Sequence, residues 1–272
     1  MRIFLTIPLQ LNLKNYIVSV YPLAEGSYTV AQDKVFNPFN PETDSMKDRP
    51  ASLLVEIQPF LIVLKDDILL CDTGLGYKNA EGELMLYKNI RDRGYEPNQV
   101  TKVLLTHLHF DHLGGAVINT GEGLQLAFPE AIYYVQKGEY ENAISHTSKS
   151  YRIEIIETLY NSGKLVLLDG DGQIDESISY EITGGHTEFH QAYTIKEGEE
   201  IYFFGGDVLP DLYQLMRKFI AKYDYDGKTS AEKRIVFGNR SVEQDSTLLF
   251  YHSLKVPFCK IIKTEVGFRM KG

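Results

Sequence analysis

Short apolar runs alternate with amphipathic stretches along the chain. Residues 51–71 are rich in β-branched and other apolar side chains, which predicts two strands joined by a turn at 65–67. Residues 86–94 have helical spacing, with Gly94 at the C-terminal cap, and a buried strand is predicted directly afterwards at 100–106. Strands and helices that alternate in this way indicate an α/β protein.

The same alternation continues through the middle of the chain. A strand at 131–135 is followed by predicted helices at 137–145 and 151–162. Further strands are predicted at 164–168, 178–183, 192–195 and 200–204. Residues 22–50, rich in Pro, Asn and Asp, predict a long loop that overhangs the site. Because no Pro- or Ser-rich linker interrupts the pattern, we expect residues 1–272 to form a single domain.

The N-terminal residues combine one positive charge with a short apolar run, as a signal peptide does. No small-x-small cleavage site follows, and residues 16–21 alternate like a strand, so a cytoplasmic protein is favoured. No stretch approaches the roughly 18 consecutive apolar residues of a membrane span. We therefore expect no membrane partner.

Composition narrows the kinds of partner. The formal net charge of −9 would repel a phosphate backbone, and no basic stripe with interleaved aromatic residues is present, so a small-molecule substrate is favoured over nucleic acid. Two cysteines, Cys71 and Cys259, are too few for a disulfide framework and are interpreted as core residues, although the two thiols could pair. The many aromatic residues and long loops make a homodimer an open alternative to a monomer.

The segment His107-Leu108-His109-Phe110-Asp111-His112 holds four ligand-type side chains within six positions, directly after a buried strand. Residues separated by one position can point toward a shared centre, while Asp111 and His112 can address a second centre nearby. Imidazole nitrogen and carboxylate oxygen are ligands that zinc accepts. Gly114 and Gly115 then let the backbone turn tightly beside the cluster.

This segment, with Thr106 before it and Gly114-Gly115 after it, resembles the signature of the metallo-β-lactamase superfamily. The resemblance implies an αββα sandwich of two mixed sheets flanked by helices. It also implies a metal site at one edge, between the sheets.

The other motifs of that family have matches in the same order along the chain. Asp72 lies in Leu-Cys-Asp-Thr-Gly and resembles the aspartate that supports the site through a ligand. His186 in Thr-Gly-Gly-His-Thr resembles the third-motif histidine, and Asp207 in Phe-Phe-Gly-Gly-Asp resembles the aspartate that bridges two metals. His252, at the end of Leu-Leu-Phe-Tyr-His, resembles the final histidine ligand and has the least specific surroundings.

The resemblance assigns seven ligands to two divalent metal ions. The first ion would be bound by His107, His109 and His186, the second by Asp111, His112 and His252, and both by Asp207. Zinc is favoured, although the same donors can hold Mn, Fe or Co. His190 is interpreted as a packing or supporting residue and His146 as a surface residue.

Two metals of this kind would supply hydroxide near neutral pH and polarise the bond under attack. Asp111 is predicted to orient that hydroxide and to carry its proton to the leaving group. The sequence therefore predicts a dinuclear metal-dependent hydrolase that acts on a small molecule. The metal-bound hydroxide would attack an ester-type bond of that molecule.

The substrate depends on positions outside the ligand set. Many zinc β-lactamases have a cysteine where this chain has Asp207, so β-lactam hydrolysis is disfavoured. Lactonases and organophosphate hydrolases of the superfamily share the motifs, which favours a lactone, with phosphoester, phosphotriester or thioester hydrolysis as alternatives. The lactonases place a tyrosine three residues after the bridging aspartate, where this chain has Pro210, and Tyr213 or Tyr202 could substitute for it. An alternative of another class is a non-hydrolytic metal-binding or regulatory module.

Overall fold

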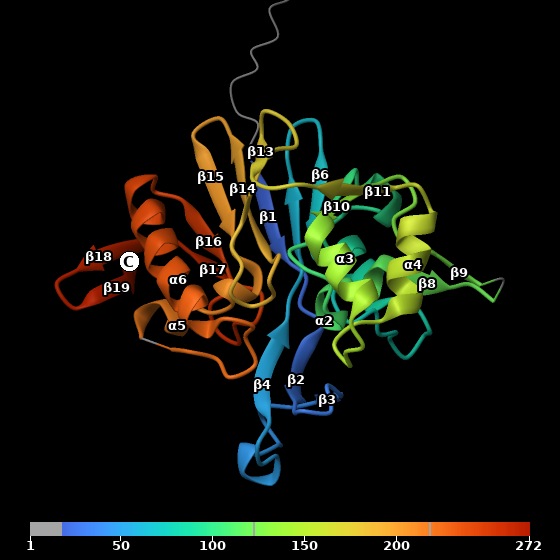
Figure 1. Cartoon of the computed structure of the whole chain (residues 1–272), viewed down its shortest axis with the longest axis horizontal. Coiled ribbons are helices and arrows are strands. Elements are labelled where there is room, and N and C mark those ends of the chain that lie inside the picture. Colours follow the sequence, from blue (N-terminus) through green and yellow to red (C-terminus); the bar gives the residue numbers. More distant parts are fainter. Residues whose placement is uncertain (1–17, 122, 218) are drawn as a thin grey trace, which may run out of the picture.

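Two mixed six-stranded sheets lie face to face, with helices on both outer sides (Figure 1). This arrangement is seen in a computed structural model that describes residues 18–121, 123–217 and 219–272. The first sheet has the order β1-β5-β6-β7-β10-β11 and the second the order β12-β13-β14-β15-β16-β17. The αββα sandwich predicted from the sequence is confirmed.

The strands of each sheet are short and mostly buried. Those of the first sheet are β1 (Ser19–Pro22), β5 (Phe60–Val63), β6 (Ile68–Cys71), β7 (Lys102–Leu104), β10 (Ile132–Gln136) and β11 (Leu165–Leu168). Those of the second are β12 (Gly172–Gln173), β13 (Ile178–Ile182), β14 (Gln191–Glu197), β15 (Glu200–Phe204), β16 (Thr247–Leu249) and β17 (Phe258–Cys259). In the first sheet β6, β7, β10 and β11 run parallel, and in the second β15 and β16 do.

Helices cover the outer face of each sheet. The helices beside the first sheet are α1 (Met85–Arg91), α3 (Lys137–Ser145) and α4 (Ile153–Asn161), and those beside the second are α5 (Leu212–Met216) and α6 (Gly227–Glu243). The short helix α2 (Phe110–Leu113) lies at the lower edge, between the two halves (Figure 1). Single 3-10 turns span Met46–Asp48, Pro97–Gln99, Gly114–Ala116 and Gly206–Val208.

Successive residues of the central strands belong to different hydrophobic cores. Leu70 and Val103 pack under α1, α3 and α4, whereas Leu69, Cys71 and Leu104 pack between the sheets. A strand that is buried on both faces needs an apolar residue at every position rather than at every second one. This explains the continuous apolar runs of the sequence.

The segment from residue 22 to 71 differs from its prediction. Residues 22–50 are not only a loop, because they contain β2 (Gly26–Val30) and β3 (Phe36–Pro38). These strands pair with β4 (Leu53–Ile57) in a separate three-stranded sheet that projects below the sandwich (Figure 1). Residues 51–71 therefore form three strands, β4, β5 and β6, where two were expected. Alternation alone did not reveal the break between β4 and β5, at Gln58 and Pro59.

Two further differences concern helices. Helix α1 ends at Arg91, and a turn carries the chain to Gly94, whose φ of 85° suits glycine. The 17-residue helix α6 was not predicted, and its N-cap is Asp226, whose side chain accepts from two backbone amides. Two hairpins, β8 (Val117–Asn119) with β9 (Leu124–Leu126) and β18 (Ile261–Thr264) with β19 (Gly267–Met270), complete the elements of the described part.

Some predictions concern residues near the termini or the thiols. Residues 16 and 17 of the strand expected at 16–21 lie outside the described residues, and β1 begins at Ser19. Cys71 and Cys259 are free thiols rather than a disulfide. Within the described ranges, no helix combines the length and apolar character needed to cross a membrane.

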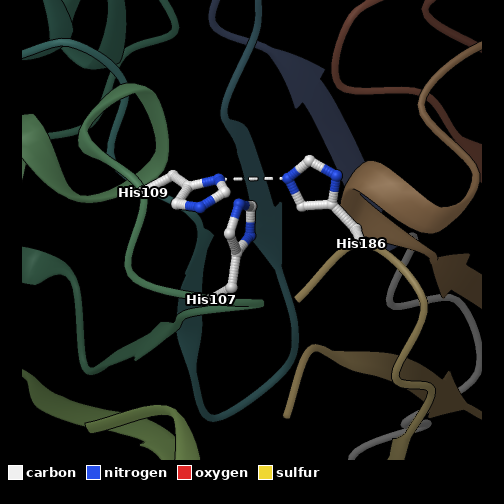
Figure 2. A group of neighbouring side chains, drawn as sticks. All are labelled: His107, His109 and His186. Atoms are coloured by element: carbon white, nitrogen blue, oxygen red, sulfur yellow. Dashed lines mark hydrogen bonds between the residues drawn. The ribbon is translucent and has the colours of Figure 1, made fainter. Parts of the chain in front are cut away.

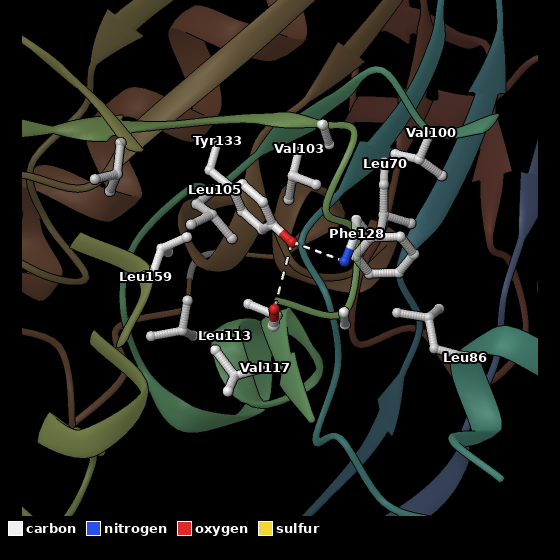
Figure 3. Close-up of a cluster of buried hydrophobic side chains, with 14 of the residues drawn as sticks. Leu70, Leu86, Val100, Val103, Leu105, Leu113, Val117, Phe128, Tyr133 and Leu159 are labelled. Carbon is white, nitrogen blue, oxygen red and sulfur yellow. Dashed lines mark hydrogen bonds between the residues drawn. The ribbon is translucent and has the colours of Figure 1, made fainter. Parts of the chain in front are cut away.

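One buried hydroxyl joins the segment after the histidine motif to the first sheet. Tyr133 of β10 lies fully buried among Leu70, Val103 and Phe128 (Figure 3). Its hydroxyl accepts from the amide of Phe128 at 3.1 Å and donates to the carbonyl of Ala116 at 3.3 Å. Because a buried backbone group without a partner is costly, this hydroxyl stabilises the connection between these two points.

We expect Tyr133→Phe to lower the free energy of unfolding by about 1 to 3 kcal/mol, since it leaves the buried amide of Phe128 without a partner, whereas the Ala116 carbonyl keeps its bond from the Ala127 amide. Urea unfolding of the variant measures this. Tyr160→Phe is the matched control, because Tyr160 is 47% exposed. Equal effects of the two substitutions would contradict the role given to the Tyr133 hydroxyl.

Candidate metal centre

The predicted ligand residues all follow the ends of strands. Asp72 comes directly after β6, and His107 follows β7, its parallel neighbour. His186 follows β13, while Asp207 and His252 follow the parallel strands β15 and β16. Parallel strands end at the same edge of a sheet, so residues far apart in the sequence are brought together there.

Three histidines form the first group (Figure 2). The rings of His107, His109 and His186 converge, and their ligand nitrogens lie within 4.8 Å of one another. His109 Nδ1 and His186 Nε2 are 3.0 Å apart. The exposed side chain of His146 lies elsewhere, on the surface, as expected.

Asp207 connects this group to a second one. Its Oδ2 lies 3.2 Å from His186 Nε2, whereas its Oδ1 lies 3.1 Å from His112 Nε2 and 3.0 Å from His252 Nε2. Asp111 Oδ2 completes the second group, 3.6 Å from both His112 Nε2 and His252 Nε2. One carboxylate thus offers an oxygen to each group, which is the arrangement of a bridging ligand.

Hydrogen bonds at the opposite ring nitrogen fix the orientation of four of these imidazoles. The Nδ1 atoms of His107, His112, His186 and His252 lie 2.7 to 3.0 Å from Thr106 Oγ1, Asp72 Oδ2, Asp224 Oδ1 and the Glu56 carbonyl, respectively. Since carboxylate and carbonyl oxygens only accept, Nδ1 carries the proton in at least three of these rings. In the neutral imidazole Nε2 is then a lone-pair donor directed into the centre.

The centre contains buried polar atoms without hydrogen-bond partners. These atoms are His107 Nε2, His112 Nε2 and Asp207 Oδ1, all in the described part of the chain. Lone pairs of nitrogen and oxygen that face each other at about 3 Å repel unless a proton or a cation lies between them. Ligand atoms around a tetrahedral zinc ion, with bonds of about 2.0 Å, have similar separations. The nitrogen and oxygen donors therefore fit divalent metal ions.

Burial and neighbouring charge act differently on the two groups. In the first group burial, together with nearby histidines, holds the pKa of His107 and His109 well below the usual range. In the second group burial opposes the charged form, but Asp207 and Asp111 outweigh it and raise the pKa of His112 well above that range. The second group thus lies in the more negative environment, which favours a cation.

Asp207 has the opposite balance. Burial raises the pKa of its carboxyl, but His252, His112 and His186 outweigh burial and lower it well below the usual range.

His190, fully buried behind the site, accepts from the Asp207 amide through Nε2 at 3.1 Å and pairs with Thr183 Oγ1 through Nδ1. His190 thus positions the Asp207 backbone, as a supporting residue would.

Asp72 lies behind the ligands rather than among them. Its Oδ1 accepts from the Thr106 amide at 2.8 Å, and its Oδ2 accepts from Thr106 Oγ1 at 2.8 Å and from His112 Nδ1 at 2.7 Å. The backbone of Asp72 is left-handed, with φ of 55°, a conformation that Asp tolerates better than most residues. Asp72 therefore fixes the strand end that carries the histidine motif.

Sequence reasoning missed several residues that hold the site together. Asp224 and Tyr223 precede α6, and the Tyr223 ring centroid lies 6.0 Å from that of His186. Glu139 is fully buried and accepts from the Leu108 amide and from Thr187 Oγ1. None of these residues belongs to a ligand motif, so their roles depend on contacts over long sequence distances.

Tyr202 and Tyr213 were predicted as substitutes for the tyrosine that lactonases have at the position of Pro210. They lie in different environments. Tyr202 packs between the sheets and lines a cavity of about 390 Å³ with Val20 and Cys259, away from the ligands. Tyr213 is 49% exposed on α5. Pro210 is buried, and its carbonyl accepts from the His252 amide at 3.0 Å. The structure thus gives Tyr202 a packing role.

Glu25 is a buried carboxyl beside the Asp72 loop. Its Oε2 accepts from the Leu75 amide at 2.8 Å, whereas Oε1 is buried without a hydrogen-bond partner. Burial raises its pKa to about 8. Gly74, with φ of 71°, leaves the space for this carboxyl, because a Cβ there would lie 2.5 Å from Oε2.

We expect Asp224→Ala to weaken metal binding roughly 10- to 100-fold, because His186 loses the acceptor that orients its ring. Competition with a chromogenic chelator measures this affinity. Asp245→Ala is the control, since the Asp245 carboxylate pairs on the surface with Lys260 and Lys271. Equal affinity in the wild type and the Asp224 variant would show that the carboxylate is not needed to orient the ligand.

Glu25 predicts a dependence of stability on pH. Its pKa is raised from 4.5 to about 8 in the folded protein, so the folded state holds the proton more tightly than the unfolded state between these values. The contribution of Glu25 to the free energy of unfolding therefore falls as pH rises through that window, by up to about 1.4 kcal/mol per pH unit. Glu25→Gln should remove this pH dependence. Urea unfolding from pH 5 to 9 compares the two proteins. A difference in stability that stays constant with pH would contradict the buried-carboxyl assignment.

Comparison with known proteins identifies the family of this chain. The family model of the metallo-beta-lactamase superfamily matches residues 57–238. An N-acyl homoserine lactonase from a Bacillus species is 28% identical over 169 residues, which cover 54% of this chain and 61% of that protein. The match thus spans less than two thirds of the length of that relative.

Solved structures share the fold at lower sequence identity. AidC, a dizinc quorum-quenching lactonase solved with a product, matches with a TM-score of 0.71 and 19% identity over 93% of this chain and 94% of its own. The hydrolase AbOPH matches with a TM-score of 0.72 and 20% identity over 93% of each chain. Since the family model covers more than half of the sequence and the αββα fold agrees with it, this chain belongs to the metallo-beta-lactamase superfamily.

Proposed function

We propose that this protein is a hydrolase that binds two divalent metal ions and opens a small lactone. The observation that carries the proposal is the inward orientation of Nε2 in four histidines whose Nδ1 atoms are held from behind. Together with His109, Asp111 and the shared carboxylate of Asp207, these rings supply seven ligands in two groups.

Zinc is the metal that we propose, because nitrogen and oxygen donors in a site with an open position suit it. The same donors can hold Mn, Fe or Co. When bound, two such ions supply Lewis acidity and activate water near neutral pH. What the chain contributes is the position of each ligand and a group that can move a proton.

Asp111 is the residue that we propose for proton transfer. Its side chain is 14% exposed, so solvent can reach the carboxylate, and Tyr251 Oη anchors its backbone by donating to the Asp111 carbonyl. The attacking oxygen adds to the ester carbonyl carbon and the ring C–O bond breaks. Asp111 carries the proton from the attacking oxygen to the leaving oxygen, and the product is a hydroxy acid.

A lactone is favoured because lactonases occur among both the sequence relatives and the structural matches. The phenol that lactonases place at the position of Pro210 is absent. Tyr223, beside His186, offers a phenol on the same side as that ligand. Phosphotriester hydrolysis is the second candidate, because organophosphate hydrolases of the superfamily share the ligand motifs of this chain.

A non-hydrolytic metal-binding module is the alternative of another class. It would bind metal through the same residues without turning over any substrate. The intact set of seven candidate ligands, together with the lactonases among the sequence relatives, supports the enzyme over the module.

We expect the metal-loaded protein to hydrolyse γ-butyrolactone or a longer-chain lactone and to lose activity with EDTA. His109→Ala should lower kcat/KM by at least roughly 100-fold, since it removes a ligand of the first group. The assay panel includes a phosphotriester and a thioester, and His146→Ala serves as the control on an exposed histidine. Bound metal without hydrolysis of any of these substrates would contradict the enzyme proposal and favour the module.

A further inference from the structure

The small sheet of β2, β3 and β4 forms one wall beside the metal centre. Aromatic rings connect it to the histidine motif: the Tyr28 ring lies 5.8 Å from that of Tyr77, and Tyr77 lies 6.4 Å from Phe110. Phe110 directly follows His109 in the sequence. The wall thus continues up to a residue next to a candidate ligand.

Lys34 occupies the turn between β2 and β3 in an unusual conformation. Its φ is 60°, a left-handed value that favours glycine, and a residue with a side chain costs about 1 kcal/mol there. Its ammonium lies 5.9 Å from the ring centroid of Tyr223, which in turn adjoins His186. The positive charge of Lys34 is also close enough to help lower the pKa of His109. A lysine held in this strained turn is best explained by what its charge binds.

Arg152 places a second positive charge next to the histidine motif. Its guanidinium lies 4.5 Å from the ring centroid of Phe110, and it donates to the carbonyl of Lys149 at 2.7 Å. The neighbouring Tyr151 ring lies 5.3 Å from that of His109. Two cations therefore flank the histidine motif from different elements.

Neither cation is neutralised by an ion pair. Within the described ranges, no carboxylate lies within 4.0 Å of the Lys34 ammonium or of the Arg152 guanidinium. This is notable in a chain with a net charge of −9. Acidic side chains are abundant, yet none pairs with the two cations beside the site. An anion that enters with the substrate would supply the missing charge.

We propose that the substrate carries an acidic group, such as a carboxylate or a phosphate, in addition to the bond that is hydrolysed, and that Lys34 binds it. The inference rests on the proposed function, because it takes the metal ions to hold the reacting end of the substrate. A neutral lactone would leave the two cations unpaired. A lactone or ester with an acidic substituent would pair with Lys34.

The test compares two ligands of equal length that differ by one charge. Hexanoate can place its single carboxylate at the metals, whereas adipate can place a second one at Lys34. Isothermal titration of the metal-loaded protein measures both dissociation constants, without turnover. We expect adipate to bind roughly 10-fold more tightly than hexanoate at low salt, and this preference to shrink as salt screens the charge.

Lys34→Gly should abolish the preference for adipate while it relieves the left-handed strain, so its unfolding midpoint should be equal to or above that of the wild type. Lys34→Arg should retain most of the preference. Lys47→Ala, which removes an exposed lysine from the same projecting segment, is the control and should bind both ligands as the wild type does. Equal affinity for the two ligands in the wild type, or a preference that persists in Lys34→Gly, would overturn the proposal.

These outcomes are separable from those of the proposed function. Selective adipate binding that needs Lys34, in a protein that hydrolyses no lactone or ester, would sink the proposed function and leave the anion site intact. Hydrolysis of neutral lactones by a protein that binds adipate no better than hexanoate would do the reverse.

Discussion

The carboxylate of Asp207 is shared between two groups of histidines, and the rest of the site depends on this sharing. One oxygen faces His186, and the other faces His112 and His252. A carboxylate and imidazole lone pairs buried at such distances need positive charge between them. The parallel ends of β15 and β16 place Asp207 and His252 on one side, and those of β6 and β7 place the histidine motif on the other.

The ligands are held by acceptors that lie outside the ligand motifs. Three histidines each donate a hydrogen bond from Nδ1, one to Asp72, one to Asp224 and one to the Glu56 carbonyl. Each acceptor comes from a different part of the chain: a strand end, the segment before α6, and β4 of the projecting sheet. The geometry of the centre is therefore a property of the whole sandwich rather than of the histidine motif alone.

Most of the architecture could be predicted from the sequence, because local signals specify it. The helix at 137–145 has the predicted bounds, and the continuous apolar runs mark strands buried on both faces. Residues 22–50 were predicted as a loop, because β2 and β3 are short and their pairing with β4 and with each other cannot be recognised from local sequence. Helix α6 lacks a strong apolar period, so its start at the Asp226 cap was not recognised.

The same division applies to the site. The seven candidate ligands lie in local motifs with recognisable spacing, and the fold brings them together. Asp224, Tyr223 and Lys34 carry no such signal, because each acts across a distance that only the tertiary structure defines. Substrate choice depends mainly on residues of this second kind. This explains why the sequence indicates the type of chemistry more sharply than the molecule on which it acts.

If Asp207 bridges two metal ions, as we propose, anomalous diffraction from metal-soaked crystals, collected on both sides of the metal absorption edge, will locate both of them. We expect two peaks about 3.5 to 4 Å apart, one among His107, His109 and His186 and one among Asp111, His112 and His252, with Asp207 between them. A single peak, or two peaks that do not share the Asp207 carboxylate, would show that this carboxylate is not a bridge.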